Sequence, residues 1–133
     1  MMFGLFGKRQ KRGGARTAPR VDVDIRVYAI GDIHGRLDLL CALLGKISAD
    51  SATHPAACHK LIFLGDYVDR GNQSRELLEL LSQGPIDGFA TTYLRGNHEN
   101  FLLRFLDDTS DGASWLYYGG ANTLISYGIP ASP

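Results

Sequence analysis

Gly65-Asp66-Tyr67-Val68-Asp69-Arg70-Gly71 directly follows the apolar run Leu61–Leu64. An apolar run of this length is typical of a buried β-strand, and such a strand ordinarily ends in a polar turn. This turn holds two aspartates and an arginine between two glycines. Carboxylates packed so closely repel one another unless a cation lies among them, and aspartate oxygens are good ligands for divalent metals. The heptapeptide therefore indicates either a plain polar turn or part of a metal site.

The same pattern occurs on both sides of the heptapeptide. The predicted strand Arg26–Ile30 ends in Gly31-Asp32-Ile33-His34-Gly35, and the predicted strand Phe89–Leu94 ends in Arg95-Gly96-Asn97-His98-Glu99. The first strand is mostly apolar, so we expect both of its faces to be buried. Asp32 and Asp66 are 34 positions apart, and Asp66 and Asn97 are 31 apart. Each spacing is about the roughly 30 residues of one βαβ unit.

Apolar residues at helical spacing follow each of the three turns, which predicts three amphipathic helices. The side chains expected to face the core are Leu37, Leu40, Cys41, Leu44, Ile47, Leu77, Leu78, Leu81, Phe101, Leu102, Phe105 and Leu106. We expect Asn72 or Ser74 to cap the second helix, and Gly84-Pro85 to end it. Alternating strands and helices predict an α/β fold whose parallel sheet has right-handed crossovers.

Two connections and a last helix complete the predicted chain. Residues 48–59 are polar, and we expect a surface loop there, because His54, Cys58 and His59 make an incomplete set of zinc ligands. A second loop is predicted over residues 107–112. The last short helix is expected at about Asn122–Tyr127.

Charge divides the 133 residues into two parts. Residues 1–20 carry six basic residues and no acid, whereas the remainder carries 14 acids and eight bases. We therefore expect a disordered basic tail over residues 1–24 and one folded domain over residues 25–133. The acidic body argues against nucleic acid as a partner. No apolar run approaches the roughly 20 residues of a membrane span. Two cysteines without metal or redox spacing favour a cytoplasmic location.

The three polar turns are expected to meet, because the carboxyl ends of parallel strands lie along one edge of a sheet. Asp32, His34 and Asp66 suit one divalent ion, and Asp66 with Asn97 suits a second. A carboxylate that bridges two metals about 3.5–4 Å apart is used to clamp an in-line phosphoryl displacement by a bridging water. The sequence therefore predicts a two-metal phosphoryl-transfer site.

Three further side chains have roles at such a site. Arg70 offers a planar fork to phosphate oxygens, and the Asn97 amide also lies where substrate would bind. His98 directly follows a predicted ligand and is placed to give a proton to the leaving group. Asp69 is placed to hold His98. The predicted catalytic residues are therefore His98, Asp69 and Arg70, of which Arg70 binds the phosphate.

The three turns resemble the signature blocks of the phosphoprotein phosphatases, a family of calcineurin-like metallophosphoesterases that act on phosphoserine and phosphothreonine. Residues 115–120 (Trp-Leu-Tyr-Tyr-Gly-Gly) and residues 126–128 (Ser-Tyr-Gly) are similar to its bacterial branch. The resemblance implies a two-layered β-sandwich flanked by helices. It implies two divalent metals, manganese first, with iron or zinc as alternatives. It also implies the ligand and catalytic roles given above, and a phosphoprotein or small phosphoester as substrate.

One departure from the family pattern qualifies this prediction. The family completes its second metal site with two later histidines and adds a second phosphate-binding arginine, but no histidine or arginine follows Arg104 here. We therefore expect the N-terminal half of a longer domain, containing only the first βαβαβ half of the sandwich. Two other functions stay open: a dinucleoside polyphosphate hydrolase of the same superfamily, and a catalytically impaired metal-binding fragment.

Overall fold

The computed structural model describes Ala18 and residues 20–130, so most of the predicted basic tail over residues 1–24 lies outside the described residues. The regular elements in chain order are β1 (Ile25–Ile30), α1 (Leu37–Thr53), β2 (Cys58–Phe63), α2 (Ser74–Gln83), β3 (Phe89–Tyr93), α3 (Asn97–Asp107), a 3₁₀ turn (Thr109–Asp111), α4 (Gly112–Trp115), a kinked wide helical segment (Leu116–Gly120) and α5 (Ala121–Ser126). Among the described helices, none combines the length and apolarity needed to cross a membrane.

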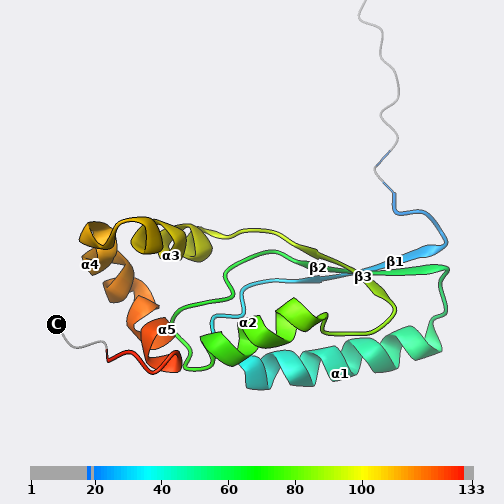
Figure 1. Ribbon diagram of the computed structural model, residues 1–133. Helices are drawn as coiled ribbons and strands as arrows, with labels where there is room; N and C mark the ends of the chain where they lie inside the picture. The colour runs from blue at the N-terminus through cyan, green and yellow to red at the C-terminus, as the bar shows by residue number, and fades with distance from the viewer. Residues whose placement is uncertain (1–17, 19, 131–133) are drawn as a thin grey trace, which may run out of the picture.

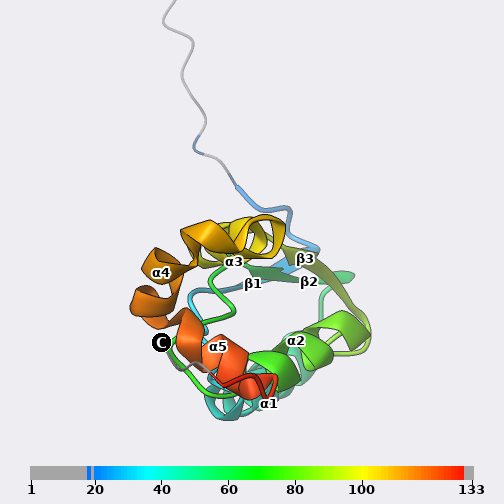
Figure 2. The same cartoon turned by 60° about the vertical axis from the view of Figure 1, so that its left-hand side comes forward.

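The strands form a parallel sheet in the order β1-β2-β3. Ile25 lies opposite Cys58 at one end of the sheet and Ile30 lies opposite Phe63 at the other. All three strands run toward α3, and α1 and α2 lie along one face of the sheet (Figures 1 and 2). The predicted α/β fold with a βαβαβ order is therefore confirmed. The described residues hold this one sheet, so the second layer of the predicted sandwich is not among them.

The hydrophobic core lies between this sheet and its two covering helices. Its buried members are Ile30, Ile33, Leu40, Leu44, Ile47, Leu61, Phe63, Tyr67, Val68, Leu77 and Leu81. Burying one such aliphatic side chain contributes about 1.5–3 kcal/mol. The Phe63 ring also stacks on Tyr93 of β3, with the ring centroids 5.2 Å apart.

The opposite face of the sheet is open, so the prediction that β1 is buried on both faces is wrong. Val27 and Ala29 of β1 are exposed, and so are Lys60 of β2 and Thr92 of β3. Strand register explains this result, because Val27 lies opposite Lys60 and Ala29 lies opposite Ile62, which lies opposite Thr92. Successive residues along a strand point to opposite faces of the sheet, so these exposed residues share the face that the helices do not cover.

Several details of the helices also differ from the sequence-based expectation. Helix α1 continues to Thr53 through the predicted loop, and β2 begins at Cys58, three residues early. Cys41 and Leu106 were expected to face the core, but both are exposed. Helix α4 begins at Gly112, the last residue of the loop predicted over residues 107–112, and the helical segment Leu116–Gly120 lies where no element was predicted. The spacing of Leu40, Leu44 and Ile47 correctly predicts the buried face of α1, and Cys41 lies beside that face.

Neither residue predicted to cap α2 does so. Gln73 occupies the cap position and makes no capping bond with its side chain. Ser74 lies inside the first turn, fully buried, with its hydroxyl 3.3 Å from the Thr123 hydroxyl. Asn72 instead accepts a hydrogen bond from Asn122, which links the turn before α2 to α5. The predicted end of α2 at Gly84 is confirmed.

Tyr67 fastens the turn after β2 to the end of β3. Its hydroxyl donates to the Leu94 carbonyl at 2.6 Å, and burial together with the nearby Glu99 carboxylate raises the pKa of Tyr67 to about 12. Because this pKa lies above its ordinary 10.0, the neutral phenol stabilises the fold fully below pH 10. That stability is lost as the pH rises through the folded-state pKa.

We expect Tyr67→Phe to weaken the alkaline loss of stability. The free energy of unfolding, measured in urea at intervals from pH 8 to pH 11.5, should fall less steeply above pH 10 in the variant. Its stability at pH 8 should be lower by about 1 kcal/mol, because the hydrogen bond is lost. Tyr93, whose pKa burial also raises, leaves a residual slope in both proteins. Equal slopes above pH 10 would contradict this role of Tyr67.

Candidate functional site

Backbone hydrogen bonds join the first polar turn to the second. The Asp66 carbonyl accepts from the amides of Ile33 and His34 at 3.0 and 2.9 Å. The Gly35 amide donates to the Tyr67 carbonyl at 2.7 Å. These bonds hold the turns after β1 and β2 side by side at the carboxyl edge of the sheet, beside the start of α3 (Figure 1).

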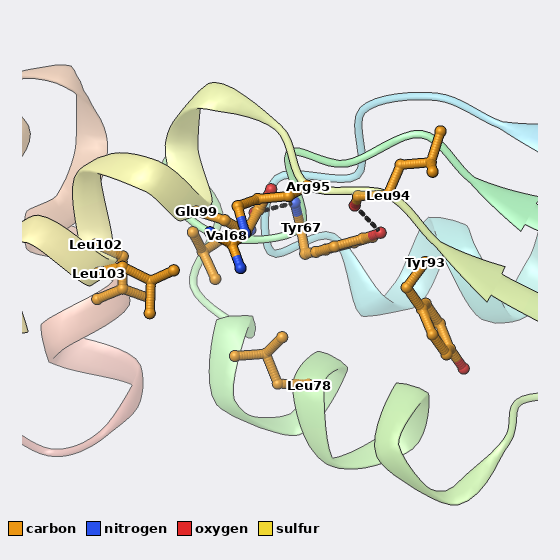
Figure 3. A pocket seen from close by; sticks show the side chains of 9 residues that line it. All are labelled: Tyr67, Val68, Leu78, Tyr93, Leu94, Arg95, Glu99, Leu102 and Leu103. Atoms are coloured by element: carbon orange, nitrogen blue, oxygen red, sulfur yellow. Dashed lines mark hydrogen bonds between the residues drawn. The ribbon is translucent and has the colours of Figure 1, made fainter.

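Glu99 joins the second turn to the third, and sequence reasoning missed it. One carboxylate oxygen accepts from the amides of Asp66 at 2.8 Å and Gly96 at 2.9 Å. The other accepts from the amide of Tyr67 at 2.8 Å, as Figure 3 shows. One sequence signal could have found it: Glu99 lies three residues after Gly96, the residue that precedes α3, which is the spacing of a capping box. Glycine at position 96 has no side chain to return the bond, so only half of that box forms.

The turns hold four non-glycine residues in the left-handed region of backbone space. They are His34 at φ 47°, Asp66 at 56°, Asp69 at 73° and Arg70 at 68°. Each such residue costs about 1–2 kcal/mol, and strain of this kind persists only where the surroundings impose it. All four are residues that the sequence assigns to the site. Gly96 leaves room for one of them, because a Cβ on Gly96 would collide with the amide and carboxylate of Asp66.

One ring nitrogen of His34 bonds to the backbone, and the other has no partner in the described part of the chain. Its Nδ1 lies 2.8 Å from the Val68 carbonyl, which can only accept, so Nδ1 carries the proton. The lone pair is then on Nε2, which is buried and has no hydrogen-bond partner among the described residues. A metal-bound histidine commonly fixes its other nitrogen on a carbonyl in this way. The orphaned Nε2 is therefore a fit for a metal ion.

Oxygen and nitrogen ligands surround that nitrogen. Ligand atoms of His34, Asp66 and His98 all lie within 4.8 Å of one another. Asp32 is more exposed, and its carboxylate lies 3.9 Å from His34 Nε2. Asn97 begins α3 and its side chain is exposed. The predicted ligands thus lie at one edge of the sheet, and His98, predicted as an acid, lies among them. His54 and His59, which are not in this group, bond to local backbone carbonyls.

Asp69 and His98 form a buried pair. Asp69 is 0% exposed and His98 is 3% exposed, and the carboxylate lies 2.7 Å from Nδ1 of the ring. Arg70 Nη2 lies 3.1 Å from the other ring nitrogen, Nε2. A guanidinium can only donate, so Nε2 accepts and Nδ1 carries the proton that points at Asp69. Arg70 therefore covers the nitrogen that a proton donor would use.

Two more side chains bond to the Asp69 carboxylate, and sequence reasoning assigned neither a role. Trp115 Nε1 donates to it at 2.9 Å and the Thr123 hydroxyl donates at 2.7 Å. They lie 46 and 54 residues along the chain from Asp69. No local spacing signals a contact at that separation, although residues 115–120 were singled out as a motif.

Two hollows border the polar cluster, one with Glu99 and the other with Thr123 in its wall, but both are lined mainly by apolar side chains. One of about 280 Å³ is lined by side chains that include Tyr67, Leu78, Tyr93 and Leu102 (Figure 3). Another of about 430 Å³ lies between α3 and α5, and its walls are almost entirely apolar. Apolar walls do not suit a phosphoester, whose charged oxygens need cationic or hydrogen-bonding partners. The polar cluster is therefore the better candidate for chemistry.

Known proteins resemble most of the chain. A family profile described as calcineurin-like phosphoesterase matches residues 25–129. Serine/threonine-protein phosphatase 2 of Escherichia coli is 36% identical over 94 residues, covering 71% of this chain and 38% of that protein. Serine/threonine-protein phosphatase with EF-hands 1 of Rattus norvegicus is 39% identical over 89 residues, covering 66% of this chain and 12% of that protein.

A relative of a second kind is similar over a comparable length of the chain. A bis(5'-nucleosyl)-tetraphosphatase (asymmetrical) of Bacillus cereus is 33% identical over 104 residues, covering 75% of this chain and 37% of that protein. The chain thus spans less than two fifths of the length of these relatives. No solved structure matches it significantly.

Proposed function

We propose, from the premise that this chain belongs to the calcineurin-like phosphoesterase family, that it carries part of the active site of a metal-dependent phosphoester hydrolase. The observation that carries the proposal is the Nε2 of His34, which has no partner within residues 20–130, beside the carboxylate of Asp66 and the buried Asp69–His98 pair. A serine/threonine protein phosphatase is the most specific form of the proposal. We call the natural chain that contains these residues the whole protein.

Two divalent ions are proposed, with manganese first and iron or zinc as alternatives. Asp32, His34 and Asp66 would hold one ion, and Asp66 with Asn97 would hold the other. When bound, such ions polarise phosphoryl oxygens and lower the pKa of a coordinated water. No histidine or arginine follows Arg104 in this sequence, so a full ligand set for the second ion needs residues that these 133 do not include.

The remaining polar side chains have proposed roles that fit their contacts. Arg70 binds the phosphoryl group through its fork of donors, and Asn97 lies at the same edge. The guanidinium now bonds to His98 Nε2, so turning it toward a phosphate frees that nitrogen. In the tautomer described above Nε2 carries a lone pair, so the freed nitrogen first takes up a proton from solvent, and the doubly protonated ring then gives that proton to the leaving oxygen. Asp69 positions the ring through Nδ1.

A dinucleoside polyphosphate hydrolase is the second candidate, because a relative with that name is about as similar as the phosphatases. The complete Asp69-Arg70-Gly71 ending and Tyr67 favour the phosphatase. A metal-binding fragment without chemistry is the third. Against it stands the burial of Asp69 and His98, since buried polar pairs are costly to keep without a use.

For domain organisation, we propose that residues 25–133 are the first part of the catalytic domain and that residues 1–24 are a basic tail. The share of each relative that the chain covers supports this proposal. A cytoplasmic location is proposed because both cysteines are free. The reading frame after the codon for Pro133 provides a check: two histidines and an arginine encoded there would support the division.

The proposed function is tested with three substrates and added manganese. The whole protein should hydrolyse p-nitrophenyl phosphate and a phosphoserine peptide, and diadenosine tetraphosphate more slowly. For the 133-residue chain alone we expect weak or no turnover. Faster cleavage of diadenosine tetraphosphate would favour the second candidate. Metal binding by the whole protein without cleavage of any of the three would favour the third.

A further inference from the structure

We propose that Trp115 and Thr123 are positioning residues, which fix the Asp69 carboxylate so that it holds His98 in one tautomer and one orientation. The inference rests on the proposed function, because it assigns a purpose to the Asp69–His98 pair. The geometry that carries it is the set of donors around Asp69. Both of its carboxylate oxygens are occupied, by side chains from three different helical elements.

The Thr123 hydroxyl bonds to Asp69 in two directions. It donates to one carboxylate oxygen at 2.7 Å and accepts from the Asp69 amide at 2.9 Å. The Thr123 hydroxyl has a single proton, which it donates in the hydrogen bond to the carboxylate. The Ser74 hydroxyl at 3.3 Å must therefore be the donor in its bond to Thr123. A directed chain therefore runs from Ser74 through Thr123 to Asp69. All three residues are at most 2% exposed.

Trp115 holds the other carboxylate oxygen. Its indole nitrogen donates at 2.9 Å to the same oxygen that bonds His98 Nδ1. The indole is 1% exposed and packs against the Phe105 ring with centroids 4.7 Å apart. A Cβ on Gly120 would collide with the indole, so the backbone lies directly on it. The Trp115 ring therefore has little freedom to move.

This arrangement fixes the carboxylate plane. An isolated aspartate can turn about its terminal torsion and offer either oxygen to a histidine. Here Thr123 occupies one oxygen and Trp115 shares the other with His98, so a single rotamer satisfies all donors at once. The same segment also reaches Arg70, whose amide donates to the Gly119 carbonyl at 3.0 Å. Residues 115–123 thus position both the proposed proton donor and the proposed phosphate-binding residue.

Conservative variants test this inference. Thr123→Val keeps the shape of the side chain and removes the hydroxyl, whereas Thr123→Ser keeps the hydroxyl. Trp115→Phe removes the indole N–H. Thr92→Val is a matched control, because Thr92 is exposed on β3, away from the site. Melting temperatures identify any variant that does not fold, and the Thr123 pair decides the matter if Trp115→Phe fails to fold.

Two measurements are made on these proteins. The first is NMR of the His98 ring nitrogens in the ¹⁵N-histidine-labelled 133-residue chain, which needs no turnover. The wild type should show a single tautomer protonated at Nδ1, and Thr123→Val should show a mixture.

The second measurement is the steady-state hydrolysis of p-nitrophenyl phosphate by the whole protein with manganese. There kcat should fall about 10- to 100-fold in Thr123→Val and Trp115→Phe, with KM nearly unchanged. Thr123→Ser should restore kcat.

The outcomes separate this inference from the proposed function. If the whole protein hydrolyses nothing, the proposed function fails, and the NMR tautomer still decides whether Thr123 positions His98. A His98 tautomer in Thr123→Val identical to that of the wild type would overturn the positioning role. So would a Thr123→Ser protein as slow as Thr123→Val, or losses of kcat that merely follow the unfolded fraction.

Discussion

Hydrolysis of p-nitrophenyl phosphate by the manganese-loaded whole protein should be lost in Asp66→Asn. Asp66 is the residue proposed to touch both metals, and an amide replaces its charge with a neutral group. Its carboxylate also accepts from the His98 amide at 3.0 Å, so the change disturbs the third turn as well. We expect kcat/KM to fall by more than about 10³-fold, because the charge that stabilises the transition state is removed.

A control variant and a second site variant make this prediction specific. Asp87→Asn removes an exposed acid outside the site and should leave the rate unchanged. His98→Asn should lower kcat by about 10²- to 10⁴-fold, the usual contribution of a general acid. Undiminished activity in both Asp66→Asn and His98→Asn would show that the three turns are not the active site.

Glu99→Ala should cause the largest loss of stability among the site variants. The carboxylate of Glu99 accepts hydrogen bonds at 2.8–2.9 Å from three backbone amides, those of Asp66, Tyr67 and Gly96. Alanine leaves all three donors without a partner inside the protein. An unsatisfied donor costs about 1–3 kcal/mol when it is buried, and because these three bonds are partly buried we expect the free energy of unfolding to fall by about 3 kcal/mol.

Urea unfolding of the 133-residue chain measures this effect. Glu79→Ala is the matched control, because Glu79 lies on an exposed face of α2 in an ion pair with Arg75. Exposed pairs of that kind contribute only about 0.3–0.5 kcal/mol. A Glu99→Ala protein no less stable than Glu79→Ala would show that solvent satisfies the three amides. The left-handed conformations of Asp66 and its neighbours would then need another cause.

The order of strands and helices could be predicted from sequence because each element carries a local signal. Leu61 and Phe63 are buried in β2 as the apolar run indicates, and the turns at Gly31, Gly65 and Gly96 do meet at one edge. The residues at which helices and strands begin and end were harder to predict from sequence. Residues 48–53 are mostly polar or small yet continue α1, and Asp50 in this stretch accepts hydrogen bonds from Arg26 and Tyr28 of β1, a tertiary contact that overrides weak local preferences.

The supporting contacts of the site depend on tertiary structure. Ser74 looks like a helix cap by position, but burial against Thr123 gives it another partner. Trp115 meets Asp69 only after the chain has passed through β3 and α3. The left-handed φ of Arg70 likewise has no local signature, because only aspartate, asparagine, histidine and glycine are enriched in that region. The residues with proposed chemistry follow a pattern that is visible in the sequence, whereas the residues that hold them in place follow none.

Binding of Mn²⁺ to the 133-residue chain, measured by isothermal titration calorimetry, tests the central claim most directly. It asks whether the polar turns after β1, β2 and β3 make a metal site. Wild-type chain should bind at least one ion, and Asp66→Asn and His34→Ala should each abolish that binding while Asp87→Asn keeps it. No binding by the wild type, or equal binding by Asp66→Asn, would contradict the claim.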